Sequence, residues 1–387
     1  MKIIPTTPAY VFDGDRFAGR VQMVADVMGP DIPVSYAIKS NSFLLHAIPQ
    51  SIHRLEVCSP GELAICQSLR IPAERIIYSG VMKEKSDILE ALNYGVDIMT
   101  AESARHIELL CQAQQERGAD MRPQRLILRL TSGNQFGMEA DEIVRLIGAY
   151  RDHPALDIIG IHYYSGTQKS RLKAIEKDIQ RLENLLERLQ QDIGYVAQLV
   201  EYGPGMAVSC FAGSDEACET EDRRMAETVA VLLRPFAAKY PLAIELGRFL
   251  AAPCGTYYTS VMDLKHNDDV NYALVDGGIH HLRYYGQTMA MQIPPMEVFG
   301  GDDSCSAERQ TYAICGSLCT TADVLVREVK LPKLKIGDVI GFGRCGAYSV
   351  TEASVLFLSR QAPSVWLLTG GEHRLLRESQ PTYPLNH

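Results

Sequence analysis

Eight short apolar segments constrain the fold more strongly than any other feature of the sequence. They alternate with helix-period segments through the first two thirds of the chain, and most are continuously apolar, as expected for strands buried on both faces of a parallel sheet. No glycine-rich dinucleotide fingerprint follows an early strand, so the α/β pattern favours a closed (β/α)₈ TIM barrel over a doubly wound sheet. The predicted strands are 34–39, 55–59, 76–80, 96–100, 125–130, 158–164, 198–203 and 242–247.

The pattern changes after about residue 250. Segments such as TYYTSVMDLK and GDVIGFG are β-like, are separated by turn residues and show little helical period. We therefore predict a barrel over residues 25–250 and a mainly β domain over 251–387. The opening segment PAYVFD also resembles a strand, so residues 1–24 are assigned to the β domain. A length of 387 residues is enough for two domains.

Charge and hydropathy exclude several classes of protein. The chain has 38 Lys+Arg against 47 Asp+Glu, a net charge of −9, which argues against nucleic acid or an anionic membrane as the main partner. No apolar run approaches the roughly 18 residues that span a bilayer. The start MKIIPTTPAY lacks the basic region and apolar stretch of a secretory signal. We predict a soluble, cytoplasmic protein.

The ten cysteines show no CxxC pair and no zinc-like spacing, which indicates a reducing compartment and mostly core thiols. Cys315 and Cys319 lie four residues apart without a nearby histidine or second pair. The adjacent His280 and His281 would point to opposite faces of a strand. We therefore predict no metal site. The acidic segment 213–224 (GSDEACETEDRR) is expected to be a solvated loop.

The active site of a (β/α)₈ barrel forms at the carboxyl ends of its strands. Lys39 ends the predicted strand VSYAIK, and lysine is costly to bury without a partner. Its amine either extends to the rim of the barrel or is a sheltered amine that forms a Schiff base with an aldehyde. Lys39 by itself does not decide between the two.

Two other strand ends carry residues that suit an anionic ligand. The turn Gly203-Pro204-Gly205 lets backbone N–H groups approach an anion closely, although it is also an ordinary strand-ending turn. Glu245 and Arg248 end the next strand and either face one ligand or pair with each other at the rim. A lysine that traps an aldehyde, a phosphate cradle and a carboxylate together describe pyridoxal phosphate better than any other cofactor.

Ten motifs follow one another along the chain: TPAYVFD, YAIKSN, EVCSPGEL, NQFGM, GIHYYSGTQ, EYGPG, ELGRFL, VDGG, CGSLCTTAD and GAYSV. Through these motifs the chain resembles the fold-type III pyridoxal-phosphate decarboxylases, the family of the diaminopimelate, ornithine and arginine decarboxylases. The resemblance implies an alanine-racemase-like barrel that holds the cofactor. It also implies a C-terminal β domain and a homodimer in which each active site is built from both subunits.

By this resemblance, Lys39 would bind the aldehyde of pyridoxal 5'-phosphate and the Glu245 carboxylate would hold the pyridine nitrogen. A carboxylate there keeps the ring charged, so that the ring withdraws electrons from the substrate when CO₂ leaves. Gly203, Gly205 and Arg248 would bind the phosphate.

The resemblance assigns five further residues. Thr167 would lie near the phosphate, Tyr348 against it and Tyr164 on the pyridine ring. Cys319 would come from the other subunit and return a proton to the substrate, a task that suits a thiol of tunable pKa. Asp323 would help to hold the substrate. The residue types alone also fit a core thiol at Cys319, a turn residue at Asp323 and domain packing at Tyr348.

Three features depart from the diaminopimelate and ornithine enzymes. Tyr164 stands where those enzymes carry a histidine, and a phenol stacks on a ring with different electrostatics. Thr320 follows Cys319 where the diaminopimelate enzymes carry a glutamate, so it lacks the charge to bind a distal ammonium in the substrate pocket. The stretch RLTSGNQFGM is shorter than the usual loop, so part of one pocket wall is altered.

With these departures the chain is similar to the specialised-pathway branch of the family. That branch resembles the butirosin-type enzyme that decarboxylates a glutamyl group on an acyl carrier protein, and the siderophore decarboxylases that act on conjugated amino acids. We therefore expect removal of the α-carboxylate of an amino acid or amino-acid conjugate, with an acyl carrier protein as a candidate partner. A diaminopimelate, ornithine or lysine decarboxylase of primary metabolism remains the alternative.

Two other classes stay open. A racemase of the same fold carries an arginine at the pyridine nitrogen, so Glu245 favours decarboxylation. Small barrel proteins that only carry pyridoxal phosphate lack a C-terminal β domain, so the residues after 250 argue against that class.

Overall fold

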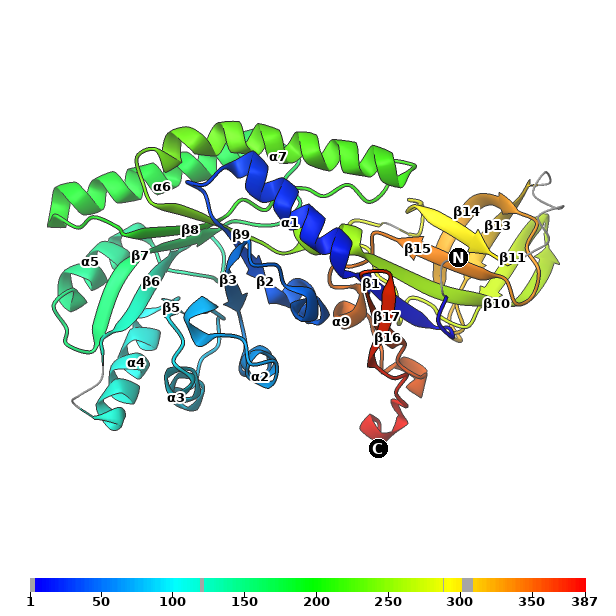
Figure 1. Cartoon of the computed structure of the whole chain (residues 1–387), viewed down its shortest axis with the longest axis horizontal. Helices are drawn as coiled ribbons and strands as arrows, with labels where there is room; N and C mark the ends of the chain where they lie inside the picture. The colour runs from blue at the N-terminus through cyan, green and yellow to red at the C-terminus, as the bar shows by residue number, and fades with distance from the viewer. Residues whose placement is uncertain (1–3, 119–121, 288, 301–308) are drawn as a thin grey trace.

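The computed structural model describes residues 4–118, 122–287, 289–300 and 309–387. The chain folds into a barrel with outer helices and, beside it, a mainly β part (Figure 1). The predicted combination of a TIM barrel and a C-terminal β part is confirmed.

Eight parallel strands close the barrel in chain order, because the first of them pairs with both the second and the last. Each overlaps one of the predicted segments, so the prediction of eight buried strands is confirmed. Lys39 does not end a strand but lies in the 3₁₀ turn Ile38–Ser40 that follows β2. The strands are β2 (Val34–Ala37), β3 (Ile52–Val57), β4 (Ile76–Tyr78), β5 (Ile98–Ala101), β6 (Gln124–Leu130), β7 (Leu156–Tyr164), β8 (Leu199–Gly203) and β9 (Leu242–Leu246).

The barrel interior changes from apolar to polar towards the carboxyl ends of the strands. Six strands contribute one apolar residue each to a closed floor: Ile77, Ile98, Ile127, Ile159, Leu199 and Ala243. Because strand side chains alternate, residues two positions further along face the same interior, except on β7, where a register shift after Ile158 turns His162 to the interior in place of Ile161. Five of those positions are polar and buried, namely Ser79, Thr100, Arg129, Glu201 and Glu245. Polar groups are costly to bury, so this second layer indicates a functional interior.

Helices cover the outside of the barrel (Figure 1). The residues that the structure describes include no helix long and apolar enough to cross a lipid bilayer. The helices are α1 (Gly14–Met28), α2 (Pro60–Ser68), α3 (Lys85–Tyr94), α4 (Ala104–Arg117), α5 (Ala140–Tyr150), α6 (Leu172–Ile193), α7 (Asp215–Ala237) and α8 (Arg248–Ala251).

The prediction of a solvated loop over 213–224 is wrong, because α7 begins at Asp215. The Ser214 hydroxyl accepts the backbone N–H of Ala217 at 3.2 Å and caps the helix, and the acidic residues of the first turn favour the positive end of its dipole. Arg16, Arg20 and Arg344, which are distant in the sequence, form ion pairs with the carboxylates of this segment. These ion pairs neutralise much of its negative charge, and the local sequence pattern does not predict them.

The β part is one large sheet with the strand order β14-β13-β11-β10-β1-β16-β17, to which β15 and β12 add beside β10. The opening strand β1 (Ala9–Asp13) pairs antiparallel with β10 and parallel with β16, while α1 directly after it packs on α7 of the barrel. The remaining strands are β10 (Gly255–Asn267), β11 (Val270–Val275), β12 (Met296–Phe299), β13 (Arg309–Cys315), β14 (Val324–Pro332), β15 (Val339–Gly343), β16 (Ser364–Thr369) and β17 (Glu372–Arg377), and α9 (Ser349–Glu352) follows β15.

Candidate active site

A cavity opens at the carboxyl end of the barrel, where the polar layer begins. Strand ends of the barrel supply most of its lining, and the segment after β15 supplies the rest. Seven residues predicted from the sequence meet here: Lys39, Tyr164, Thr167, Gly205, Glu245, Arg248 and Tyr348. Gly203 lies directly behind them, because a Cβ on it would come within 2.7 Å of Glu245 Oε1.

The Lys39 ammonium is paired with carboxylates. Its Nζ donates to Glu56 Oε2 at 2.8 Å, and the Lys39 side chain is 38% exposed because it extends into the open mouth. Burial lowers the pKa of Lys39, but the charges of Glu56 and Glu245 outweigh burial and hold that pKa well above its usual value. The amine must therefore lose a proton before it can attack an aldehyde.

Glu245 forms the other charged pair of the cavity. Its Oε2 lies 3.3 Å from His162 Nε2, and both side chains are almost fully buried. Burial raises the pKa of Glu245, but the imidazole of His162 and the ammonium of Lys39 outweigh burial and lower that pKa. The carboxylate therefore stays ionised and can hold a protonated pyridine nitrogen.

Glu56 and His162 were not predicted as site residues from the sequence. Ligand atoms of Glu56, His162 and Glu245 all lie within 4.8 Å of one another, a spacing that could hold a metal ion. The charges of the two carboxylates are already compensated by protein groups, because Glu56 pairs with Lys39 and Glu245 pairs with His162. Strand alternation could have revealed His162, since it lies two residues before Tyr164 and therefore on the same face of β7.

Close backbone contacts shape the floor of the cavity. Gly205 has φ +60°, and a Cβ on it would lie 1.8 Å from the carbonyl oxygen of Gly166. A Cβ on Gly203 would lie 2.5 Å from the Tyr164 ring. Glycine is therefore required at both positions, and the turn stays open for a close backbone approach to an anion.

Arg248 supplies the positive charge at this end of the cavity. The ring centroids of Tyr285 and Tyr348 lie 4.7 and 4.4 Å from its guanidinium carbon. Its Nε is buried and has no hydrogen-bond partner among the described residues. An unsatisfied buried donor beside an open glycine turn suits a phosphate group.

Tyr164 and Thr167 also line the cavity that contains the charged residues Lys39, Glu245 and Arg248. Burial and the nearby Glu245 raise the pKa of Tyr164 although the Lys39 ammonium lowers it, so the phenol stays neutral. A neutral aromatic side chain above Gly203 is suited to pack against a planar ring.

These residues fit pyridoxal phosphate. Lys39 offers an amine for the aldehyde, Glu245 an acceptor for the pyridine nitrogen, and Arg248 with the glycine turn a site for the phosphate. Bound pyridoxal phosphate supplies a ring that takes up the electron pair released when a bond to the substrate Cα breaks. Fold and site thus define a pyridoxal-phosphate enzyme on a TIM barrel with an added β part.

The model of the family described as "Pyridoxal-dependent decarboxylase, pyridoxal binding domain" matches residues 15–252, more than half of the chain. The protein belongs to this family and is a pyridoxal-phosphate-dependent decarboxylase, a carboxy-lyase of the group that includes the ornithine, lysine and diaminopimelate enzymes.

Relatives match along nearly the whole chain. The L-glutamyl-[BtrI acyl-carrier protein] decarboxylase of Niallia circulans is 27% identical, over 96% of this chain and 91% of that protein. A Staphylococcus aureus decarboxylase of 2-[(L-alanin-3-ylcarbamoyl)methyl]-2-hydroxybutanedioate is 25% identical, over 93% of this chain and 94% of that protein. The crystal structure of diaminopimelate decarboxylase from M. jannaschii with L-lysine aligns with a TM-score of 0.82 at 19% identity, over 98% and 91% of the two chains, and shows the same fold.

Cys319, Thr320 and Asp323 do not join the cavity of their own chain. They lie in residues 316–323, between β13 and β14, and Cys319 is exposed. Asp323 is 3% exposed, and its two carboxylate oxygens accept the backbone N–H groups of Ile279 and Leu318, each at 2.8 Å. The roles predicted for these residues need a second subunit and stay predictions.

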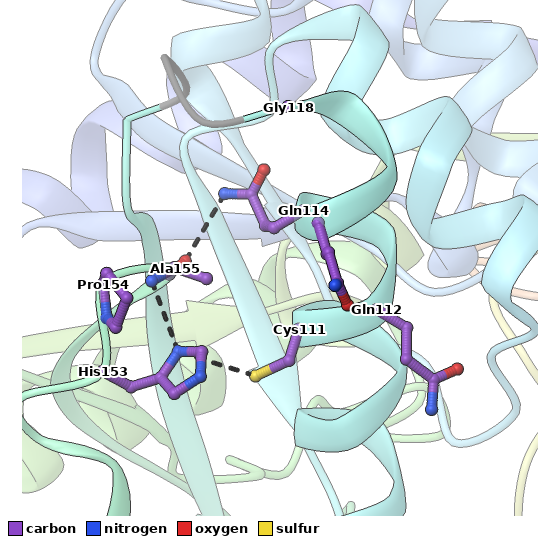
Figure 2. A pocket seen from close by; sticks show the side chains of 8 residues that line it. Cys111, Gln112, Gln114, Gly118, His153, Pro154 and Ala155 are labelled. Atoms are coloured by element: carbon purple, nitrogen blue, oxygen red, sulfur yellow. Dashed lines mark hydrogen bonds between the residues drawn. The ribbon is translucent and has the colours of Figure 1, made fainter.

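A second cavity, of about 620 Å³, lies near the opposite ends of the barrel strands, between α4 and residues 153–155 (Figure 2). Cys111 Sγ lies 3.8 Å from His153 Nδ1, which also accepts the N–H of Ala155 at 3.3 Å. Burial raises the pKa of Cys111, so the sulfur stays protonated and is not an activated nucleophile. This cavity is separate from the site around Lys39.

Proposed function

We propose that this decarboxylase removes the α-carboxylate of an amino acid carried in a larger conjugate, in a secondary-metabolite or siderophore pathway. The 316–323 loop carries this proposal. Its only acidic residue is Asp323, and both oxygens of that carboxylate already accept backbone N–H groups at 2.8 Å. The loop therefore has no carboxylate left to bind the distal ammonium of a diamino acid, and Thr320 offers only a hydroxyl.

The charged residues beside the 316–323 loop also favour a conjugated substrate over a diamino acid. A cavity of about 600 Å³ is lined by Thr321 of the loop together with Arg283 and Arg327. Arg283 donates to the carbonyl of Glu352 at 3.4 Å and Arg327 to the carbonyl of Met289 at 2.8 Å. Neither arginine pairs with a carboxylate among the described residues. Glu352 is the one carboxylate among the described residues that line this cavity, so the wall carries a net positive charge, which suits a substrate with further acidic groups better than a diamine.

The names of two relatives support a conjugated substrate. One relative acts on a glutamyl group of an acyl carrier protein, and the other on an amino acid joined to a hydroxybutanedioate. For this chain we infer the same class of substrate, with an acyl carrier protein as the candidate partner.

In the proposed reaction, Lys39, Glu245 and Cys319 have separate roles. Lys39 would hold the aldehyde of the cofactor, and Glu245, which is paired with His162, would hold the pyridine nitrogen. The bond between Cα and the α-carboxylate breaks, and CO₂ leaves without its bonding electrons. Cys319 of a partner subunit then donates its thiol proton to Cα. The proposal thus includes a homodimer in which the β part of each chain completes the other active site.

Release of CO₂ across a substrate panel tests the proposal. The panel contains diaminopimelate, lysine, ornithine, arginine and glutamate, together with carrier-linked glutamate and citryl-linked amino acids. We expect turnover of conjugates only, and Cys319→Ala should slow product formation. Turnover of a free basic amino acid at a higher kcat/KM than any conjugate would refute the proposal and place the chain in primary lysine or polyamine metabolism.

A further inference from the structure

A cluster of three arginines and three carboxylates joins the β part to the barrel. Asp215, Glu219 and Asp222 lie at i, i+4 and i+7 of α7 and therefore share one face of the helix. Arg16 and Arg20 reach them from α1, which lies along α7 in Figure 1. The third arginine comes from the turn after β15, more than a hundred residues away in the chain.

That third residue, Arg344, is the centre of the cluster. Its side chain is 0% exposed, its Nη1 lies 2.8 Å from Glu219 and 3.0 Å from Asp215, and its Nη2 pairs with Asp222. Its Nε donates to the carbonyl of Ser209 at 2.7 Å. All three nitrogens of the guanidinium are therefore used, which requires a planar fork that lysine cannot reproduce.

The backbone after Arg344 is held as tightly as its side chain. Arg344 has φ +57°, a left-handed conformation that side chains rarely adopt. Gly346 donates to the carbonyl of Ala252 at 3.0 Å and accepts from Asn41 Nδ2 at 2.8 Å. A Cβ on Gly346 would lie 2.1 Å from the carbonyl oxygen of Ala251. The segment after Arg344 is therefore hydrogen-bonded both to the residues that follow the last barrel strand and to Asn41, next to the turn that contains Lys39.

The segment ends at Tyr348, which lines the cavity. The Tyr348 N–H donates to the carbonyl of Ser40 at 2.7 Å, next to Lys39, and its ring lies over the Arg248 guanidinium at 4.4 Å. Tyr348 also has a positive φ, +65°. Arg344 and Tyr348 thus both have left-handed backbone conformations, four positions apart. The orientation of the Tyr348 ring therefore depends on where Arg344 fixes the start of the segment.

We propose that Arg344 is a positioning residue, which through the Arg344–Tyr348 segment sets the Tyr348 ring against Arg248 and so shapes the phosphate end of the cofactor site. The acidic face of α7 is its anchor. The proposal rests on the assignment of Arg248 and Tyr348 to the cofactor phosphate, and it does not depend on which substrate the enzyme uses.

Arg344→Lys tests this, because it keeps the buried charge but loses the fork. The matched control is Arg16→Lys, which changes an arginine of the same cluster that is not joined to the segment of Tyr348. Pyridoxal phosphate is titrated into each apoprotein and its dissociation constant is measured by absorbance. We expect Arg344→Lys to weaken binding about ten-fold and Arg16→Lys less than about two-fold.

A double-mutant cycle separates positioning from general loss of structure. In a Tyr348→Leu background, Arg344→Lys should have almost no further effect on the dissociation constant. Fold-changes that multiply, or equal effects of Arg344→Lys and Arg16→Lys, would overturn the proposal. If Arg344→Lys does not fold, Asp222→Asn replaces it in the same cycle with the same expectations. The cofactor titration needs no substrate, so its outcome is independent of the substrate panel.

Discussion

Replacing Asp323 with asparagine tests how the loop that carries Cys319 is held. The buried Asp323 carboxylate accepts two backbone N–H groups at 2.8 Å, and a Cβ on Gly316 would lie 2.3 Å from it, so the loop folds closely around this one group. Asparagine keeps one oxygen, so one neutral hydrogen bond survives while the other N–H faces an amide nitrogen.

The magnitude follows from these two bonds. A hydrogen bond to a charged group contributes about 2 kcal/mol and a neutral one about 1 kcal/mol. Two charged bonds are exchanged for one neutral bond, a loss of about 3 kcal/mol. Burial raises the pKa of Asp323 although the two N–H groups lower it, so removal of the buried charge offsets part of this loss, and Asp323→Asn should lower the free energy of unfolding of the β part by less than about 3 kcal/mol. The variant should also slow turnover, because the position of Cys319 depends on the same loop.

Urea unfolding followed by tryptophan fluorescence is a suitable assay, because the single tryptophan of the chain, Trp366, lies in β16 of this sheet. Asp263→Asn is the control, since that side chain is 49% exposed, and its partners among the described residues are the exposed Lys265 and the backbone N–H of its neighbour Leu264. The control should change stability by less than about 0.5 kcal/mol. If the two variants had equal stability, the carboxylate of Asp323 would not be what holds the loop.

Three further predictions follow from the site and the sheet. Lys39→Ala should abolish turnover and the absorbance of covalently bound cofactor, and retained turnover would remove the central role of Lys39. Gly205→Ala should weaken cofactor binding by at least about ten-fold, because its Cβ would lie 1.8 Å from a backbone oxygen, whereas Gly19→Ala, with nothing within 4 Å, should not. Burial lowers the pKa of His280 to about 4 and that of His281 to about 3. Between the usual histidine pKa of about 6.5 and these values the unfolded chain binds protons that the folded chain does not, so stability should fall on acidification through this range. His281→Gln should flatten that dependence in tryptophan-monitored unfolding, and an unchanged slope would contradict it.

The repeating pattern of the sequence was sufficient to predict the barrel. Continuous apolar runs mark strands buried on both faces, and a closed barrel buries eight such strands without leaving an edge. The residues at the strand ends could be predicted for the same reason, because parallel strands bring their carboxyl ends to one mouth. Lys39, Glu245 and Arg248 therefore meet in the structure although more than two hundred residues separate the first from the other two.

Alternation along β7 places His162 on the same face as Tyr164, but its pairing with Glu245 could not be predicted, since an ion pair depends on distances between segments that local pattern does not encode. Glu56 beside Lys39 and His162 beside Glu245 are separate positions in the sequence, and only barrel closure brings them into contact. The acidic start of α7 shows the same limit. Composition alone indicates a solvated segment there, whereas the structure buries Asp222 against Arg344 from the other part of the molecule. Local periodicity thus determined which segments form strands and which strand ends carry chemistry, while tertiary packing decided which charges neutralise one another, because that depends on the three-dimensional approach of residues far apart in the chain.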